Sequence, residues 1–151
     1  MVVEKETKDQ YAAKVIDKNK FGSADDRSHH FSQLRNEIRI MSTMEHKNII
    51  KFKEVFEDKD ELQIVMECCT GGELFDRIKD QEDEHYTEPK AALILRQCLE
   101  GIQYLHKRGI AHCDLKPDNF LFLDESDSSL KIIDFGMSKH VKRRAFLTSF
   151  R

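Results

Sequence analysis

Two short stretches of this chain carry side chains suited to phosphoryl transfer. Residues 112–119 supply a carboxylate at Asp114, an amine at Lys116 and a carboxamide at Asn119, and a second carboxylate, Asp134, follows an apolar run. Carboxylate and carbonyl oxygens are the protein ligands that Mg²⁺ prefers, so Asn119 and Asp134 are candidate metal ligands. Asp114 is then left to orient and deprotonate a hydroxyl group, while Lys116 can neutralise charge on the transferred phosphoryl group.

The sequences around these residues resemble two motifs of protein kinases. His-Cys-Asp-Leu-Lys-Pro-Asp-Asn matches the catalytic-loop pattern except at Cys113, where arginine is usual, and Asp-Phe-Gly follows as the metal-binding motif. Each piece alone could be an ordinary turn or loop, but both occur together and in order. The resemblance implies ATP and Mg²⁺ as cofactors, with Asp114 and Lys116 as catalytic residues and Asn119 and Asp134 as metal ligands.

A possible phosphate anchor lies near the N-terminus. Residues 10–16 read as a strand with Lys14 inside an otherwise apolar run. Such a lysine more often faces solvent, but the segment resembles the Val-Ala-Ile-Lys strand of kinases, whose lysine contacts nucleotide phosphates. A helix is predicted over 31–44, and its apolar face is Leu34, Ile38, Met41 and Met44. Glu37 borders that face, and by the resemblance we expect it to form an ion pair with Lys14.

A hinge is indicated where a hairpin of strands over 49–56 and 62–67 gives way to two glycines, Gly71 and Gly72. In kinases the backbone of this segment binds adenine, and the residue matching Met66 controls access behind the pocket. The resemblance implies the following nucleotide contacts besides Lys14 and Glu37: Ala12, Met66, Glu67, Cys69, Glu73 and Leu121.

The second half of the chain is predicted to contain a long helix and two short strands. The helix begins near Pro89 and ends before Gly109. Its expected apolar stripe is Ala92, Leu95, Leu99, Ile102 and Leu105. Strands over 120–123 and 130–133 would place Asn119 and Asp134 at strand ends that can face a common metal ion.

The fold that the resemblance implies is α+β and protein-kinase-like. Residues 1–66 would form a small lobe with an antiparallel sheet and one helix, 67–72 the hinge, and 73–151 the start of a mainly helical large lobe. The family's glycine-rich loop and Ala-Pro-Glu motif would lie just outside these 151 residues. We therefore expect either a truncated product or an incomplete gene model, with the stripe of the long helix partly exposed.

Composition excludes several other classes of protein. Hydrophobic residues are 39% and charged residues 35%, with a net charge of −3, which favours a soluble globular protein and argues against a nucleic-acid binder. No apolar run is long enough to span a bilayer and no signal peptide is recognisable, so we expect no membrane partner and a cytoplasmic or nuclear location. The four cysteines lack zinc-type spacing, and the acidic turns lack the glycine of an EF-hand.

The expected activity is transfer of the ATP γ-phosphoryl group to Ser or Thr hydroxyls of protein substrates. The serine/threonine class follows from Lys116 by resemblance, and the surrounding motifs look most like the calcium-dependent and calmodulin-dependent kinases. Two alternatives stay open: an inactive module that binds a nucleotide or a partner, and an incomplete gene model of an active kinase. Because Cys113 replaces arginine, phosphate on Thr148 or Ser149 would bind weakly, unless the basic residues 142–144 substitute. Oligomeric state is not indicated.

Overall fold

A computed structural model describes residues 1–20 and 24–141 of the chain. The basic run 142–144 and the hydroxyls of Thr148 and Ser149 lie outside the described residues, so the expectation about a phosphate site there remains a prediction.

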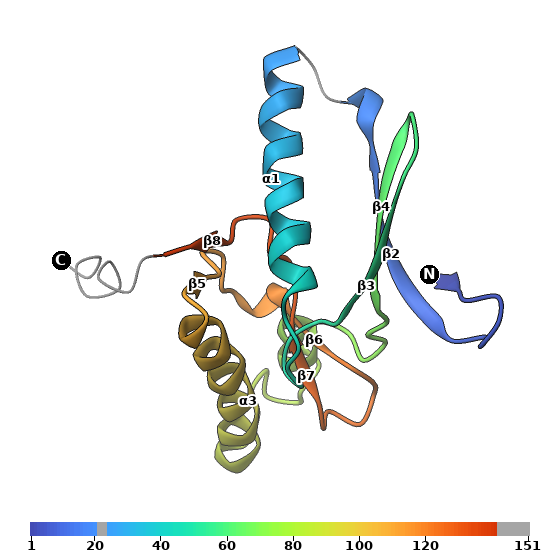
Figure 1. Cartoon of the computed structure of the whole chain (residues 1–151). Coiled ribbons are helices and arrows are strands. Elements are labelled where there is room, and N and C mark those ends of the chain that lie inside the picture. The colour runs from blue at the N-terminus through green and yellow to red at the C-terminus, as the bar shows by residue number, and fades with distance from the viewer. Residues whose placement is uncertain (21–23, 142–151) are drawn as a thin grey trace.

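A four-stranded antiparallel sheet forms one half of the molecule (Figure 1). Its strands are β1 (Val2–Val3), β2 (Gln10–Asp17), β3 (Phe52–Glu57) and β4 (Glu61–Glu67), in the order β1-β2-β4-β3. Strand β2 pairs with β4 along its whole length, with Lys14 opposite Ile64. The predicted hairpin is confirmed, but its first strand starts later, because Ile49 and Ile50 pair with Ile132 in the other half of the molecule.

The helix α1 (Ala24–Ser42) follows β2 and the short 3₁₀ helix η1 (Lys18–Lys20). It starts earlier than predicted. Its buried residues include Ile40 and Met41, whereas Leu34 and Ile38 are only partly buried, so the predicted face is correct in its C-terminal half alone. The reason is that the C-terminal half packs on the core cluster, while Leu34 lines an open cavity beside β2.

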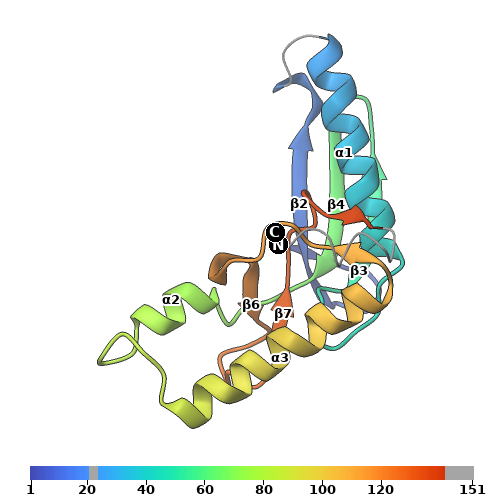
Figure 2. The same cartoon turned by 90° about the vertical axis from the view of Figure 1, so that its left-hand side faces the viewer.

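The other half of the molecule contains two helices and short paired strands (Figure 2). Its elements are α2 (Leu74–Lys79), α3 (Glu88–Lys107), β5 (Ile110–Ala111), η2 (Pro117–Asn119), β6 (Phe120–Phe122), β7 (Leu130–Ile132) and β8 (Lys139–His140). Strand β6 pairs with β7, and β5 with β8. Helix α3 lies so close to β7 that a Cβ on Gly101 would be 2.7 Å from Cδ1 of Ile132, so only glycine fits there without movement.

The buried face of α3 differs from the predicted stripe. Its buried residues are Ile94, Cys98, Gly101 and Leu105, which recur every three or four positions and face β7. Leu95 and Leu99 are 58% and 55% exposed. Of the predicted stripe, Leu105 is buried and Ile102 is partly buried, whereas Ala92, Leu95 and Leu99 are exposed. The buried face instead includes Gly101, which an apolar pattern ignores and which lies close to Ile132. Partial exposure of apolar residues on this helix is confirmed.

The difference in burial between Leu105 and Leu99 predicts different losses in the free energy of unfolding when each is replaced by alanine. Leu105 is 1% exposed within the main core. Leu105→Ala should lower the free energy of unfolding by about 2–5 kcal/mol, since it leaves a cavity that the helix cannot close. Leu99→Ala, which removes the same atoms from the exposed face, should change it by about 0.5 kcal/mol or less. Urea unfolding of both variants measures this; equal losses would contradict the assignment of the buried face.

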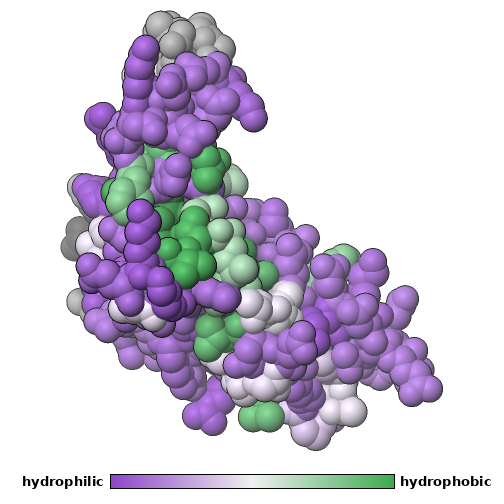
Figure 3. Space-filling view, turned by 90° about the vertical axis from the view of Figure 1, so that its right-hand side faces the viewer, coloured by the Kyte–Doolittle hydropathy of each residue, from purple (hydrophilic) through white to green (hydrophobic). Residues whose placement is uncertain are grey.

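Some large apolar side chains are exposed on the surface of the sheet. On the face that looks out from the sheet side, apolar residues gather in the middle, and hydrophilic residues lie above them and to their lower right (Figure 3). Val15 of β2 and Phe56 of β3 are among the exposed large apolar residues. Within the described part of the chain, no helix is long and apolar enough to cross a bilayer.

Candidate active site

A cavity of about 280 Å³ lies between the sheet and the segments around β6 and β7. Seven of the eight expected nucleotide contacts line it: Ala12, Lys14, Glu37, Met66, Glu67, Cys69 and Leu121. Asp134 lines it too. Glu73 does not; it forms a β-bridge with Leu121 and precedes the first residue of α2.

Four further residues line the cavity that sequence reasoning did not assign to it: Ala13, Met41, Ile50 and Ile133. Met41 lies on α1 and Ile133 directly precedes Asp134, so both were read as ordinary apolar positions. An apolar pattern predicts burial but does not distinguish the core from a cavity wall. The apolar wall suits a flat aromatic ring, and Lys14, which is paired with Glu37, lies beside Asp134.

The expected ion pair between Lys14 and Glu37 is confirmed. The distance from Lys14 Nζ to Glu37 Oε1 is 2.7 Å, and a second carboxylate oxygen, Asp134 Oδ1, lies 3.8 Å from the same nitrogen. The Glu37 side chain is 4% exposed while that of Lys14 is 41% exposed. Glu37 therefore holds the lysine from the buried side, and the open side of the amine remains available to an anionic ligand.

The hinge segment is fixed to β6 by backbone hydrogen bonds. The amide of Gly71 donates to Phe122 O at 3.1 Å, and a Cβ on Gly71 would lie 2.0 Å from Asp124 O, so only glycine permits this approach. At the start of the segment, the Lys131 amine lies 2.9 Å from Glu67 Oε2 and is largely buried. Burial raises the pKa of the Cys69 thiol to about 12, so this cavity residue stays a neutral thiol.

The loop after β5 gathers Asp114, Lys116 and Asn119. The Asn119 amide nitrogen donates to Asp114 O at 2.7 Å and to Asp114 Oδ2 at 2.9 Å, and the Lys116 amine lies 3.3 Å from Oδ2. The hydrogen bond from Asn119, and then that from Lys116, hold the pKa of the Asp114 carboxyl below its ordinary value. Asp114 is therefore ionised at neutral pH and can accept a hydrogen bond from a hydroxyl.

The buried His112 ring joins this loop to the strand that delivers Asp134. Its Nε2 is 2.9 Å from Ile133 O, and the backbone amide of Asp114 donates to its Nδ1 at 3.3 Å. A carbonyl oxygen can only accept, so Nε2 carries a proton and donates it to Ile133 O. The ring meets Phe135 edge-on with centroids 5.0 Å apart. Sequence reasoning gave His112 no role, although its place two residues before Asp114 was the available signal.

Two residues of these loops have left-handed backbone conformations. Asp134 has φ of 57°, and its Oδ1 accepts a hydrogen bond from the Gly136 amide at 3.3 Å. Cys113 has φ of 66° and is exposed, with its thiol directed to Ala111 O at 3.6 Å. Non-glycine residues in this conformation are uncommon and gather at functional sites. Here one of them is Asp134 itself, and the other directly precedes Asp114.

The polar residues present fit a magnesium ion held together with phosphates. The side-chain amide nitrogen of Asn119 donates both of its hydrogen bonds to Asp114. The amide oxygen, Oδ1, is therefore the atom that can bind a cation. The Asp134 carboxylate is 49% exposed and lines the cavity. One carboxylate and one amide oxygen are few ligands for an all-protein site, but they match the way Mg²⁺ binds when substrate phosphates complete its shell.

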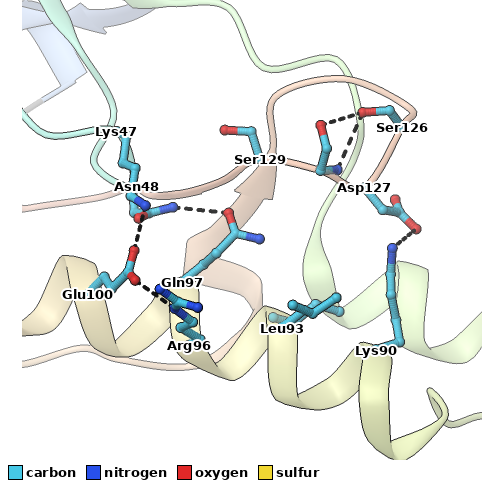
Figure 4. Close-up of a pocket in the computed structure, with 12 residues that line it drawn as sticks. Lys47, Asn48, Lys90, Leu93, Arg96, Gln97, Glu100, Ser126, Asp127 and Ser129 are labelled. Atoms are coloured by element: carbon cyan, nitrogen blue, oxygen red, sulfur yellow. Dashed lines mark hydrogen bonds and ion pairs between the residues drawn. The ribbon is translucent and has the colours of Figure 1, made fainter.

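A larger groove of about 510 Å³ lies along α3, away from these residues (Figure 4). Its charges are paired with one another: Lys47 and Arg96 both contact Glu100, and Lys90 lies 3.6 Å from Asp127. The amide nitrogen of Asn48 bonds to Gln97 and to a backbone carbonyl. These contacts tie α3 to its neighbouring loops, so we assign the groove a structural role.

Comparison with known proteins agrees with this geometry. The family model described as "Protein kinase domain" matches residues 1–151. The chain is 45% identical to calcium-dependent protein kinase 7 of Arabidopsis thaliana over 144 residues, which are 94% of this chain and 26% of that protein.

Two relatives come from Dictyostelium discoideum. A probable myosin light chain kinase is 43% identical over 147 residues, or 97% of this chain and 44% of that protein. A probable serine/threonine-protein kinase, fhkC, is 41% identical over 145 residues, or 96% of this chain and 24% of that protein. The chain thus spans between about a quarter and less than half of the length of these relatives.

Proposed function

Because the chain belongs to the protein kinase domain family, we propose that it transfers the γ-phosphoryl group of ATP to Ser or Thr hydroxyls of proteins. The observation that carries the proposal is that one cavity gathers Lys14, Glu37 and Asp134, while His112 links Asp134's strand to the loop of Asp114. Transfer of this kind needs mainly positioning and charge stabilisation, which these residues can supply.

In this proposal the nucleotide occupies the cavity. The adenine ring lies against its apolar wall and bonds to the backbone at Glu67 and Cys69, with Met66 controlling access behind it and Ala12 and Leu121 on either side. Lys14, held by Glu37, neutralises phosphate charge. Glu73, which lies outside the cavity, remains a candidate contact for the ribose or the peptide.

Asn119 and Asp134 would hold Mg²⁺, which supplies charge neutralisation for the phosphates. Asp114 accepts the hydrogen bond of the substrate hydroxyl, orients its oxygen and takes up its proton during transfer. Lys116, 3.3 Å from Asp114 Oδ2, is placed to contact the phosphoryl group that this hydroxyl attacks. The depressed pKa of Asp114 keeps the base ionised before each cycle.

A second candidate function is a non-catalytic module that binds a nucleotide or a partner protein. It is favoured by one observation, the exposure of Leu93, Leu95 and Leu99 on α3, which offers an apolar surface to a partner. A module that binds a nucleotide would bind ATP as the kinase does, so the transfer of phosphate, and not nucleotide binding, distinguishes the two candidates.

The proposal is tested first by nucleotide binding. Isothermal titration of the chain with ATP should give weak binding, about micromolar or weaker, that strengthens when Mg²⁺ is added, because Asp134 and the phosphates then share the ion. ADP should respond less to Mg²⁺, since it lacks the γ-phosphate. Binding that is indifferent to Mg²⁺, or sub-micromolar binding without it, would contradict the assigned site.

A further inference from the structure

Asn36 directly precedes Glu37 on α1, but its side chain makes a contact of its own. Its amide nitrogen donates to the backbone oxygen of Ser138 at 2.9 Å, and its amide oxygen accepts from Arg39 at 3.4 Å. The first of these bonds joins residues 102 positions apart in the chain. It ties the helix that carries Glu37 to the segment that follows Asp134.

Ser138 is a junction between three parts of the molecule. It is 3% exposed. Its hydroxyl donates to the backbone oxygen of His112 at 3.2 Å and its amide donates to Phe135 O at 3.0 Å, while its own carbonyl accepts from Asn36. A buried hydroxyl with a defined partner fixes the backbone on both sides of the bond.

The path ends at the proposed base. The His112 backbone held by Ser138 carries the ring whose Nδ1 accepts from the Asp114 amide. Helix α1, the segment after Asp134 and the loop of Asp114 are thus joined by a continuous series of hydrogen bonds.

We propose that Asn36 and Ser138 are positioning residues, which through His112 couple the placement of α1, and so of Glu37, to the placement of Asp114. The inference rests on the proposed function, in which Asp114 is the base. Neither residue contacts the cavity. If α1 shifts, Asn36 releases Ser138 and the loop of Asp114 loses a restraint, so the phosphate anchor and the base are placed together or not at all.

The test measures amide hydrogen exchange by NMR in Ser138→Ala and Asn36→Leu, without nucleotide. Exchange at the Asp114 amide should accelerate about tenfold in both variants, since the loop opens more readily. The Ile50 amide, bonded to Ile132 O in the same core, should keep its rate and report global stability. Ser32→Ala, an exposed serine on α1, is the matched control and should change neither amide.

Two further results test the coupling. Ser138→Thr, which keeps the hydroxyl, should restore slow exchange at Asp114. In steady-state phosphorylation, Ser138→Ala should lower kcat about tenfold with little change in KM for ATP, because the cavity is untouched. Unchanged exchange at Asp114, equal acceleration at Ile50, or an unaltered kcat would overturn the proposal. A wild-type chain without nucleotide binding or turnover would instead refute the proposed function, and the exchange result would still decide the coupling.

Discussion

Asp114→Asn should lower the rate of phosphoryl transfer by about 10²–10⁴-fold and leave the affinity for ATP with Mg²⁺ almost unchanged. The substitution removes the only group of the loop assigned to take the hydroxyl proton, while its shape preserves the contacts to Asn119 and Lys116. The cavity that we assign to the nucleotide does not include Asp114 among its lining residues. The defect should therefore lie in turnover and spare binding.

Asp83→Asn is the matched control for this change. Asp83 is exposed and lies between α2 and α3, outside the candidate site. Its replacement removes the same charge and should leave both rate and affinity as in the wild type. If Asp114→Asn abolished ATP binding, or if it left turnover intact, the assignment of Asp114 as the base would be wrong.

Asp134→Asn should damage binding and turnover together. The carboxylate is the one charged metal ligand proposed here, so its loss should weaken Mg²⁺-dependent nucleotide affinity by about tenfold or more and turnover by about 10³-fold. Its 3.8 Å contact with Lys14 is too long for its loss alone to disrupt the ion pair with Glu37.

The distinctive measurement for Asp134→Asn is the Mg²⁺ dependence of ATP affinity. In the wild type the affinity should rise with Mg²⁺ concentration, and in the variant this rise should be largely lost, whereas ATP affinity without metal should change little. A variant that keeps the full Mg²⁺ response would show that another group holds the ion.

The order of elements and most of the cavity could be predicted from the sequence. Lys14 and Glu37 were matched because their segments resemble the lysine strand of kinases and the helix that follows it, and their ion pair is confirmed. The nucleotide contacts came from motif resemblance, and all but Glu73 line the cavity. Apolar runs bounded by turn residues located β2, β4, β6 and β7, whereas the two-residue strands β5 and β8 were not predicted because they are too short to show a pattern.

Other features depend on packing that a sequence pattern does not encode. The buried face of α3 was misplaced at Ala92, Leu95 and Leu99 because an apolar stripe does not record that the helix approaches Ile132 at Gly101. The links from Asn36 through Ser138 to His112 escaped notice for a related reason. Each of these hydrogen bonds joins a side chain to a backbone oxygen far away in the chain. Every residue has a backbone oxygen, so the residue types do not indicate the partner.

The central claim, that this site performs phosphoryl transfer, is tested most directly by incubating the chain with γ-labelled ATP, Mg²⁺ and a library of Ser- and Thr-containing peptides. Mass spectrometry then identifies the labelled residues. We expect label on serine or threonine with the wild type and its loss with Asp114→Asn. Nucleotide binding without any label on peptides would contradict the claim and favour the non-catalytic module, and equal labelling by the wild type and Asp114→Asn would contradict the assignment of the transfer to this site.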